Sequence, residues 1–161
     1  MEISKTVQEI QRWMVSAGKT LATAESCTSG GIAKEITKVS GSSEYFQGGI
    51  VAYQDRLKIQ YLGVSAEDIA QYDVVSEPVV KQMVCGACKL FHSDYAIAST
   101  GYAGEGRNGI PSGTIWIAWG TPEDIHTKCL MQAHNRETNT QQAITEALEG
   151  LKNTIRKIKL R

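Results

Sequence analysis

The sequence reads Thr20-Leu-Ala-Thr-Ala-Glu-Ser-Cys-Thr-Ser-Gly-Gly31 where an apolar segment runs into a turn of small residues. Residues 20–25 are typical of a short strand, and residues 26–31 are typical of a turn, because serine and glycine favour tight backbone conformations. A helix is predicted from about Gly31 to Val39, where Ser40-Gly41-Ser42-Ser43 ends it. The stretch therefore predicts a strand, a turn and a helix in succession.

Strands and helices alternate on both sides of this unit. Apolar spacing predicts helices at about 3–18, 56–62, 65–72 and 76–91, and a last helix that buries Ile144, Leu148, Leu151, Ile155 and Ile158. Further strands are predicted at 46–53, 95–100, 114–119 and 125–131, the last two as an antiparallel pair. This order indicates an α/β fold: a single three-layer domain over residues 1–161, with a mixed β-sheet and helices on both faces.

Local signals refine several of these elements. Gly48-Gly49 interrupts a predicted strand, which indicates a bulge or the close approach of another group. Ser65-Ala-Glu-Asp68 has the form of a capping box. Ser76-Glu-Pro78 predicts a helix with serine as its N-cap and proline in its first turn. The apolar face expected for that helix consists of Val80, Met83, Val84, Ala87, Leu90 and Phe91.

Charge and hydropathy exclude several functional classes. The 17 basic and 17 acidic residues cancel, and the Lys/Arg-rich tail from Lys152 to Arg161 is most simply a solvated helix face, so we expect no nucleic-acid partner. Nothing approaches the ~20 apolar residues that span a bilayer, and the first segment is too charged for a signal peptide. We therefore expect a cytoplasmic protein without a membrane partner.

The four cysteines include Cys85-Gly-Ala-Cys88, which has the spacing of a redox or zinc pair. No second Cys/His pair at zinc spacing follows it, and it lies inside a predicted helix rather than at the start of one. We expect the cysteines to be reduced and the protein to hold no metal.

Ser26 is the first candidate for chemistry. A turn between a strand and a helix places N–H groups around it, an arrangement that suits a phosphate or the oxyanion of an attacked amide. An ordinary turn with serine and threonine caps explains the same residues, and both interpretations stay open. A serine also needs a base. No motif ties His92, His126 or His134 to Ser26, whereas Lys58 could serve if burial lowers its pKa; a solvated lysine is the alternative.

Seven short motifs follow one another from about Ile3 to Leu151. They are Glu25-Ser-Cys-Thr-Ser-Gly-Gly31, Gly41-Ser42-Ser43, Gly48-Gly-Ile-Val-Ala-Tyr53 with Lys58, Leu62-Gly-Val64, Val75-Ser-Glu77, Thr100-Gly101 with Ala103-Gly104, and Gly113-Thr-Ile-Trp116. Each is weak singly, but seven in register are specific. Together they resemble the CinA C-terminal domain family, whose characterised members are nicotinamide mononucleotide deamidases. The family's separate N-terminal domain is absent from the sequence, so we expect the stand-alone form.

The resemblance implies a hydrolase of the pyridine nucleotide cycle in NAD metabolism, an amidohydrolase that needs no cofactor. It implies Ser26 as nucleophile, with Lys58 and Tyr53 as the base. Arg136 would help to hold the nucleotide, and two glycine-rich loops would contact its phosphate or ribose: Thr28, Ser29, Gly30 and Gly31, and Thr100, Gly101 and Gly104. The expected partner is a small-molecule substrate, a pyridine mononucleotide, and we expect a homo-oligomer.

Four positions depart from the family pattern. Ser29 replaces a glycine, Tyr102 a small aliphatic residue, Glu105 a proline, and Thr140 follows where a second arginine is usual. A carboxylate near the nucleotide loop and a missing arginine both weaken phosphate binding. A catalytically weak or inactive paralogue that binds a nucleotide is therefore the alternative to an active amidase. A DNA-associated competence protein ranks last, because the sequence has no basic patch.

Overall fold

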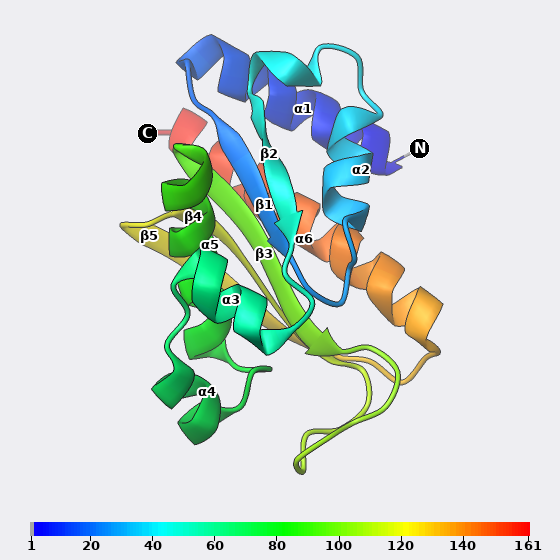
Figure 1. Cartoon of the computed structure of the whole chain (residues 1–161). Helices are drawn as coiled ribbons and strands as arrows, with labels where there is room; N and C mark the ends of the chain where they lie inside the picture. The colour runs from blue at the N-terminus through cyan, green and yellow to red at the C-terminus, as the bar shows by residue number, and fades with distance from the viewer. Residues whose placement is uncertain (1) are drawn as a thin grey trace.

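The computed structural model describes residues 2–161, which build a five-stranded mixed sheet (Figure 1). The strands are β1 (Leu21–Glu25), β2 (Phe46–Val51), β3 (Tyr95–Tyr102), β4 (Thr114–Thr121) and β5 (Asp124–Met131), in the order β2-β1-β3-β4-β5. β2, β1 and β3 run parallel, and β4 and β5 pair antiparallel. The predicted mixed sheet is confirmed.

Helices cover both faces of this sheet, as predicted (Figure 1). They are α1 (Glu2–Ala17), α2 (Gly31–Thr37), α3 (Asp55–Leu62), α4 (Ala66–Tyr72), α5 (Glu77–Phe91) and α6 (Arg136–Lys159), with a 3-10 turn at Ser42–Glu44. One apolar cluster joins α1, α2 and α6 to the sheet, and a second joins α3 and α5 to its other face. β3 serves both faces, because Ile97 packs in the first cluster while Ala96 and Ala98 pack in the second.

The crossovers place a crevice at one edge of the sheet. α2 connects β1 to β2 on one face, and α3 to α5 connect β2 to β3 on the other. β1 lies between its two parallel neighbours, β2 and β3. The connection from β1 to β2 therefore runs over one face of the sheet, and the connection from β2 to β3 runs back over the other face. Such a reversal of strand order opens a crevice at the carboxyl ends of the strands, where α/β proteins bind ligands.

The predicted irregularity in β2 is confirmed. The pairing register shifts between Leu21 and Ala22, opposite Phe46 and Gly48. A side chain at Gly49 would overlap Thr23 Oγ1, and one at Gly48 would meet the Phe91 ring. The glycines therefore allow β1 and α5 to approach β2 closely.

Some side-chain predictions need correction. Ser76 does not cap α5 with its side chain: its hydroxyl donates to the Asp73 carbonyl at 2.8 Å. Leu90 is 40% exposed, and the buried face of α5 instead includes Val79 and Cys88. Ile158 is also exposed. Half of the predicted capping box is confirmed, because the Ser65 hydroxyl accepts the Asp68 N–H at 3.1 Å; the Ser65 N–H donates to Gln82 Oε1 and not to Asp68.

The four cysteines are free; Cys85 is exposed and Cys88 buried on α5. Within residues 2–161, no cluster of three His, Cys, Asp or Glu side chains is arranged to hold a metal ion. The same residues contain no helix that is both long and apolar enough to cross a membrane.

Candidate active site

A cleft of about 1020 Å³ lies at the carboxyl ends of β1 and β3. Ser26, which follows β1 directly, lies on one wall together with Lys58 of α3. Thr100 and Tyr102 at the end of β3 and Arg136 at the start of α6 line other parts of the cleft. The topology thus brings together residues that are more than 100 positions apart in the sequence.

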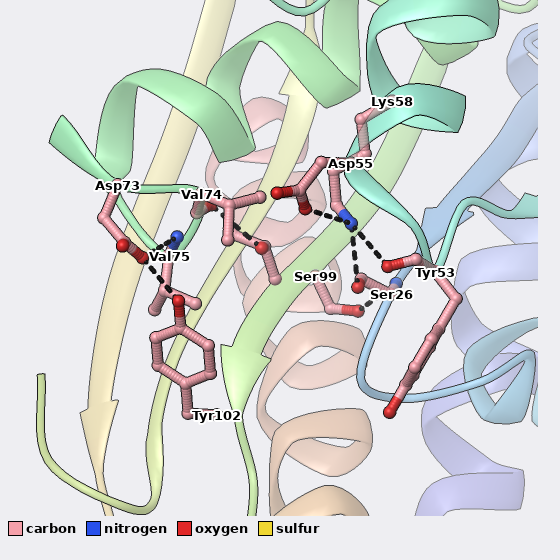
Figure 2. A network of polar contacts seen from close by, with 10 residues as sticks. Ser26, Tyr53, Asp55, Lys58, Asp73, Val74, Val75, Ser99 and Tyr102 are labelled. Carbon is pink, nitrogen blue, oxygen red and sulfur yellow. Dashed lines mark hydrogen bonds and ion pairs between the residues drawn. The ribbon is translucent and has the colours of Figure 1, made fainter. Parts of the chain in front are cut away.

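Ser26 and Lys58 are adjacent in this cleft (Figure 2). Lys58 Nζ lies 3.1 Å from Ser26 Oγ and 3.1 Å from the Tyr53 carbonyl oxygen. The Lys58 side chain is 1% exposed, because it extends from α3 toward Ser26, the residue directly after β1. A lysine five residues after Tyr53 is therefore buried and directed at the serine, not solvated.

The electrostatic surroundings of Lys58 suit a base. Burial lowers the pKa of its ammonium group, because desolvation penalises the charged form. The Asp55 carboxylate opposes this effect in part, with Oδ1 4.0 Å from Lys58 Nζ. Asp55 is half exposed, so solvent screens its attraction. The net result is a lysine with an enlarged neutral fraction, the form that accepts a proton.

Cys27, the neighbouring nucleophilic residue, faces the interior. It packs in the cluster formed by α1, α2 and α6, where burial raises the pKa of its thiol to about 12. The reactive form of a cysteine is the thiolate, which this environment suppresses. Of these two adjacent side chains, Ser26 lines the cleft and Cys27 does not.

Tyr53 takes a different position from the one expected for a base. Its side chain is 54% exposed, and its hydroxyl points away from Ser26 and Lys58 (Figure 2). What the residue offers the pair is its main-chain carbonyl, which accepts the Lys58 hydrogen bond. The structure thus brings together Ser26 and Lys58, but not the Tyr53 side chain.

The turn after Ser26 is closed by hydrogen bonds of its own. The Ser29 N–H donates to the Ser26 carbonyl, and the Gly31 N–H to that of Thr28. At the start of α2, the N–H groups of Ile32 and Ala33 donate to the Glu25 carboxylate. Glu25 therefore occupies these two N–H groups of α2, and the residues that line the cleft do not include Thr28, Ser29, Gly30 or Gly31.

The second predicted loop does reach the cleft. Thr100 and Gly101 line it, and a side chain at Gly104 would lie 2.5 Å from Arg136 Nη2, so the glycine makes room for the guanidinium. Arg107 and Glu105 also line the cleft. Arg107 was not singled out from the sequence, since one arginine in a glycine-rich loop carries no motif.

A network that the sequence did not predict joins the two sides of the cleft. The Asp73 carboxylate accepts hydrogen bonds from the Tyr102 hydroxyl at 2.8 Å and the Val75 N–H at 3.0 Å (Figure 2). It also accepts one from the Asn108 amide at 2.9 Å. Burial, and then the Asp73 carboxylate, raise the pKa of Tyr102 to about 12, so the phenol stays a donor. Asp73 has φ 77° and ψ 158°, a positive-φ conformation that a non-glycine residue adopts only under constraint.

Comparison with known proteins identifies the family. The model of the CinA C-terminal domain matches residues 3–155. The chain belongs to the CinA C-terminal domain family. The predicted resemblance and the predicted α/β fold are therefore both confirmed.

Within this family, the chain is 37% identical over 155 residues to "Nicotinamide-nucleotide amidohydrolase PncC" of Escherichia coli K12, with 93% of each chain covered. It is 42% identical over 139 residues to a "CinA-like protein" of Picosynechococcus, which covers 83% of this chain and 33% of that protein. The crystal structure of competence damage-inducible protein A from Klebsiella pneumoniae superposes with a TM-score of 0.90 at 35% identity, covering 94% of this chain and 95% of that one.

Departures from the CinA family pattern have identifiable places in the structure. Ser29 has φ 52°, a left-handed conformation that suits the family's glycine better. Glu105 lines the cleft, and Thr140 donates its hydroxyl to the Arg136 carbonyl at 2.7 Å instead of supplying a guanidinium. The histidines are elsewhere: His92 ends α5, His126 stacks on Trp119, and His134 lies before α6.

Proposed function

We propose that this protein is a nicotinamide-nucleotide amidohydrolase that converts nicotinamide mononucleotide and water to nicotinate mononucleotide and ammonia. The observation that carries the proposal is the buried Lys58 amine 3.1 Å from Ser26 Oγ in the cleft. The PncC relative supports the substrate, because its name specifies this class of nucleotide and this type of hydrolysis.

The first half of the reaction acylates Ser26. A neutral Lys58 amine donates one N–H to the Tyr53 carbonyl, so its lone pair can accept the Ser26 hydroxyl proton. Ser26 Oγ then bonds to the carboxamide carbon, forming a tetrahedral intermediate. The Lys58 ammonium returns the proton to the amide nitrogen, the C–N bond breaks, and ammonia leaves.

The second half releases the acid. Water gives a proton to Lys58 and attacks the ester carbon; the bond to Ser26 Oγ breaks, and Oγ takes the proton back. Nicotinate mononucleotide is left, with no metal or organic cofactor in either half. Arg136, next to Gly104 in the cleft, supplies a guanidinium for the substrate phosphate.

The test measures ammonia release from nicotinamide mononucleotide, nicotinamide riboside and nicotinamide. We expect the mononucleotide to be the preferred substrate. Ser26→Ala should lower kcat by several powers of ten while the protein stays folded, because nucleophile and base act as a unit. Cys27→Ala is the matched control, since the thiol is buried and protonated. Loss of activity in Cys27→Ala with activity kept in Ser26→Ala would reject the serine mechanism.

Glu105 in the cleft favours a second candidate, a CinA-like paralogue that binds a nucleotide without turning it over. Calorimetric titration with nicotinamide mononucleotide separates the two: binding without ammonia release would identify the paralogue. Cytoplasmic location and homo-oligomeric assembly stay predictions, to be checked by cell fractionation and light scattering.

A further inference from the structure

A buried carboxylate lies beside the nucleophile and is not used by the reaction proposed above. Glu25 is 1% exposed and directly precedes Ser26. Its Oε1 accepts the Ile32 N–H at 2.9 Å and the Thr28 hydroxyl at 2.6 Å, and its Oε2 accepts the Ala33 N–H at 3.0 Å. Both oxygens are thus acceptors, and the carboxylate is anchored to the first turn of α2.

The hydrogen bonds that link Thr28 and Ser99 to Glu25 can run in only one donor-to-acceptor direction. Thr28 has a single hydroxyl proton and gives it to Glu25, so the 2.7 Å contact between Thr28 Oγ1 and Ser99 Oγ must use the Ser99 proton. Ser99 Oγ is then left as an acceptor. It receives the Ser26 N–H at 3.3 Å, which the Ser99 carbonyl also accepts at 3.1 Å.

We infer that Glu25, Thr28 and Ser99 form a positioning chain that holds the Ser26 main chain so that its Oγ faces Lys58. The inference rests on the proposed role of Ser26 as nucleophile. The chain runs from the Ser26 N–H through two hydroxyls to the carboxylate, and each donor meets an acceptor. It therefore fixes the amide plane from which the Ser26 side chain projects.

Packing alone does not account for these residue types. Glu25, Thr28 and Ser99 are all at most 3% exposed, and burying an unpaired carboxylate is costly unless hydrogen bonds compensate. Thr23, on the same strand, shows the contrast: its hydroxyl is buried without a hydrogen-bond partner in residues 2–161. Burial of a threonine hydroxyl near Ser26 in the sequence is thus not sufficient to join it to this network.

The test compares Thr28→Val, which keeps the shape and removes the hydroxyl, with Thr28→Ser, which keeps the hydroxyl. We expect Thr28→Val to lower kcat for ammonia release on the order of tenfold to a hundredfold, because small displacements of a nucleophile are costly. KM and the pH midpoint of kcat/KM should stay unchanged, since Glu25, Thr28 and Ser99 neither line the cleft nor contact Lys58. Thr28→Ser should retain most of the activity. Thr23→Val is the matched control and should leave kcat unchanged.

A second readout separates this inference from the choice of substrate. A fluorophosphonate reacts with an activated serine: Oγ bonds to phosphorus, fluoride leaves, and Lys58 takes the proton. Intact-mass kinetics should show slower labelling of Thr28→Val than of wild type, and none of Ser26→Ala. If wild type is labelled but releases no ammonia, the proposed substrate fails and the labelling rates still decide the inference. Equal labelling of Thr28→Val and wild type overturns the positioning chain, and an unlabelled, inactive wild type overturns both proposals.

Discussion

Lys58 determines how the proposed reaction depends on pH. The base must be neutral, so kcat/KM rises as pH rises through the pKa of Lys58, which burial lowers from its ordinary value. The Asp55 carboxylate, 4.0 Å away, favours the ammonium and keeps this pKa higher than burial alone would set it.

Asp55→Asn should therefore lower the pKa of Lys58 further. The acid limb of the kcat/KM profile should move to lower pH, and the variant should be more active than wild type below the wild-type midpoint. Asp68→Asn, which changes a carboxylate on α4 outside the lining of the cleft, serves as the control. An acid limb that moves to higher pH, or not at all, would remove Lys58 from the role of base.

At the residue scale, the sequence indicated which residues form the candidate site but not which of their atoms are in contact. The resemblance pointed to Ser26 and Lys58, and the structure brings them together. It also pointed to Tyr53, whose carbonyl and not its hydroxyl reaches Lys58. Every residue has a carbonyl, so no sequence pattern marks one that holds a lysine. Glu25 was not predicted as a positioning residue for a different reason: its inferred link to Ser26 runs through Ser99, which lies on the neighbouring strand β3.

At the scale of elements, the close contact between β1 and β2 requires a residue without a side chain at Gly49, which can be tested by mutation. Gly49→Ala would place a methyl group against Thr23 Oγ1, which should lower the free energy of unfolding by about 1–3 kcal/mol. Removing that oxygen in Thr23→Ala/Gly49→Ala should recover part of the loss, with a coupling of about 1 kcal/mol. Urea unfolding of the two single variants and the double variant measures this cycle; strictly additive effects would contradict the contact.

Element positions followed from periodicity, because burial of one face imposes a repeat that the sequence displays. The ends followed less well. Ser76 had the right type and place for a cap, but its hydroxyl donates to the Asp73 carbonyl and accepts no N–H of α5. The orientation of this hydroxyl depends on how the segment after α4 leads into α5, which is a tertiary property. Leu90 likewise lies at helical spacing but is 40% exposed, whereas the Phe91 ring after it lies against Gly48 of β2.

At the scale of the whole molecule, the Asp73 network connects the segment between α4 and α5 to the long loop between β3 and β4. The Tyr102 hydroxyl is one of its ties. Tyr102→Phe keeps the ring and removes that hydrogen bond, which is worth about 1 kcal/mol or more when the acceptor is charged. The loop over residues 103–113 should then open roughly fivefold more often.

Hydrogen exchange of residues 103–113 measures this opening, and KM for the mononucleotide should rise with it. Tyr61→Phe on α3, whose side chain is exposed and does not line the cleft, is the control and should change neither. Unchanged exchange in Tyr102→Phe would mean that the loop is held by its other contacts. The sequence singled out Tyr102 only as a departure from the family, because its partner Asp73 belongs to a segment without a motif.

Helix α6 carries a practical consequence for anyone who wishes to attach this molecule to something else. It begins with Arg136 at the cleft and continues for 24 residues to Lys159. At ~1.5 Å per residue the two ends are about 36 Å apart, and Figure 1 shows the C-terminus at the end of the molecule away from the loop between β3 and β4. A resin, an electrode or a fluorescent fusion joined beyond Lys159 would thus be remote from the cleft. Carboxyl-terminal coupling is therefore the better choice for immobilising the protein in a sensor that detects its substrate through the ammonia released.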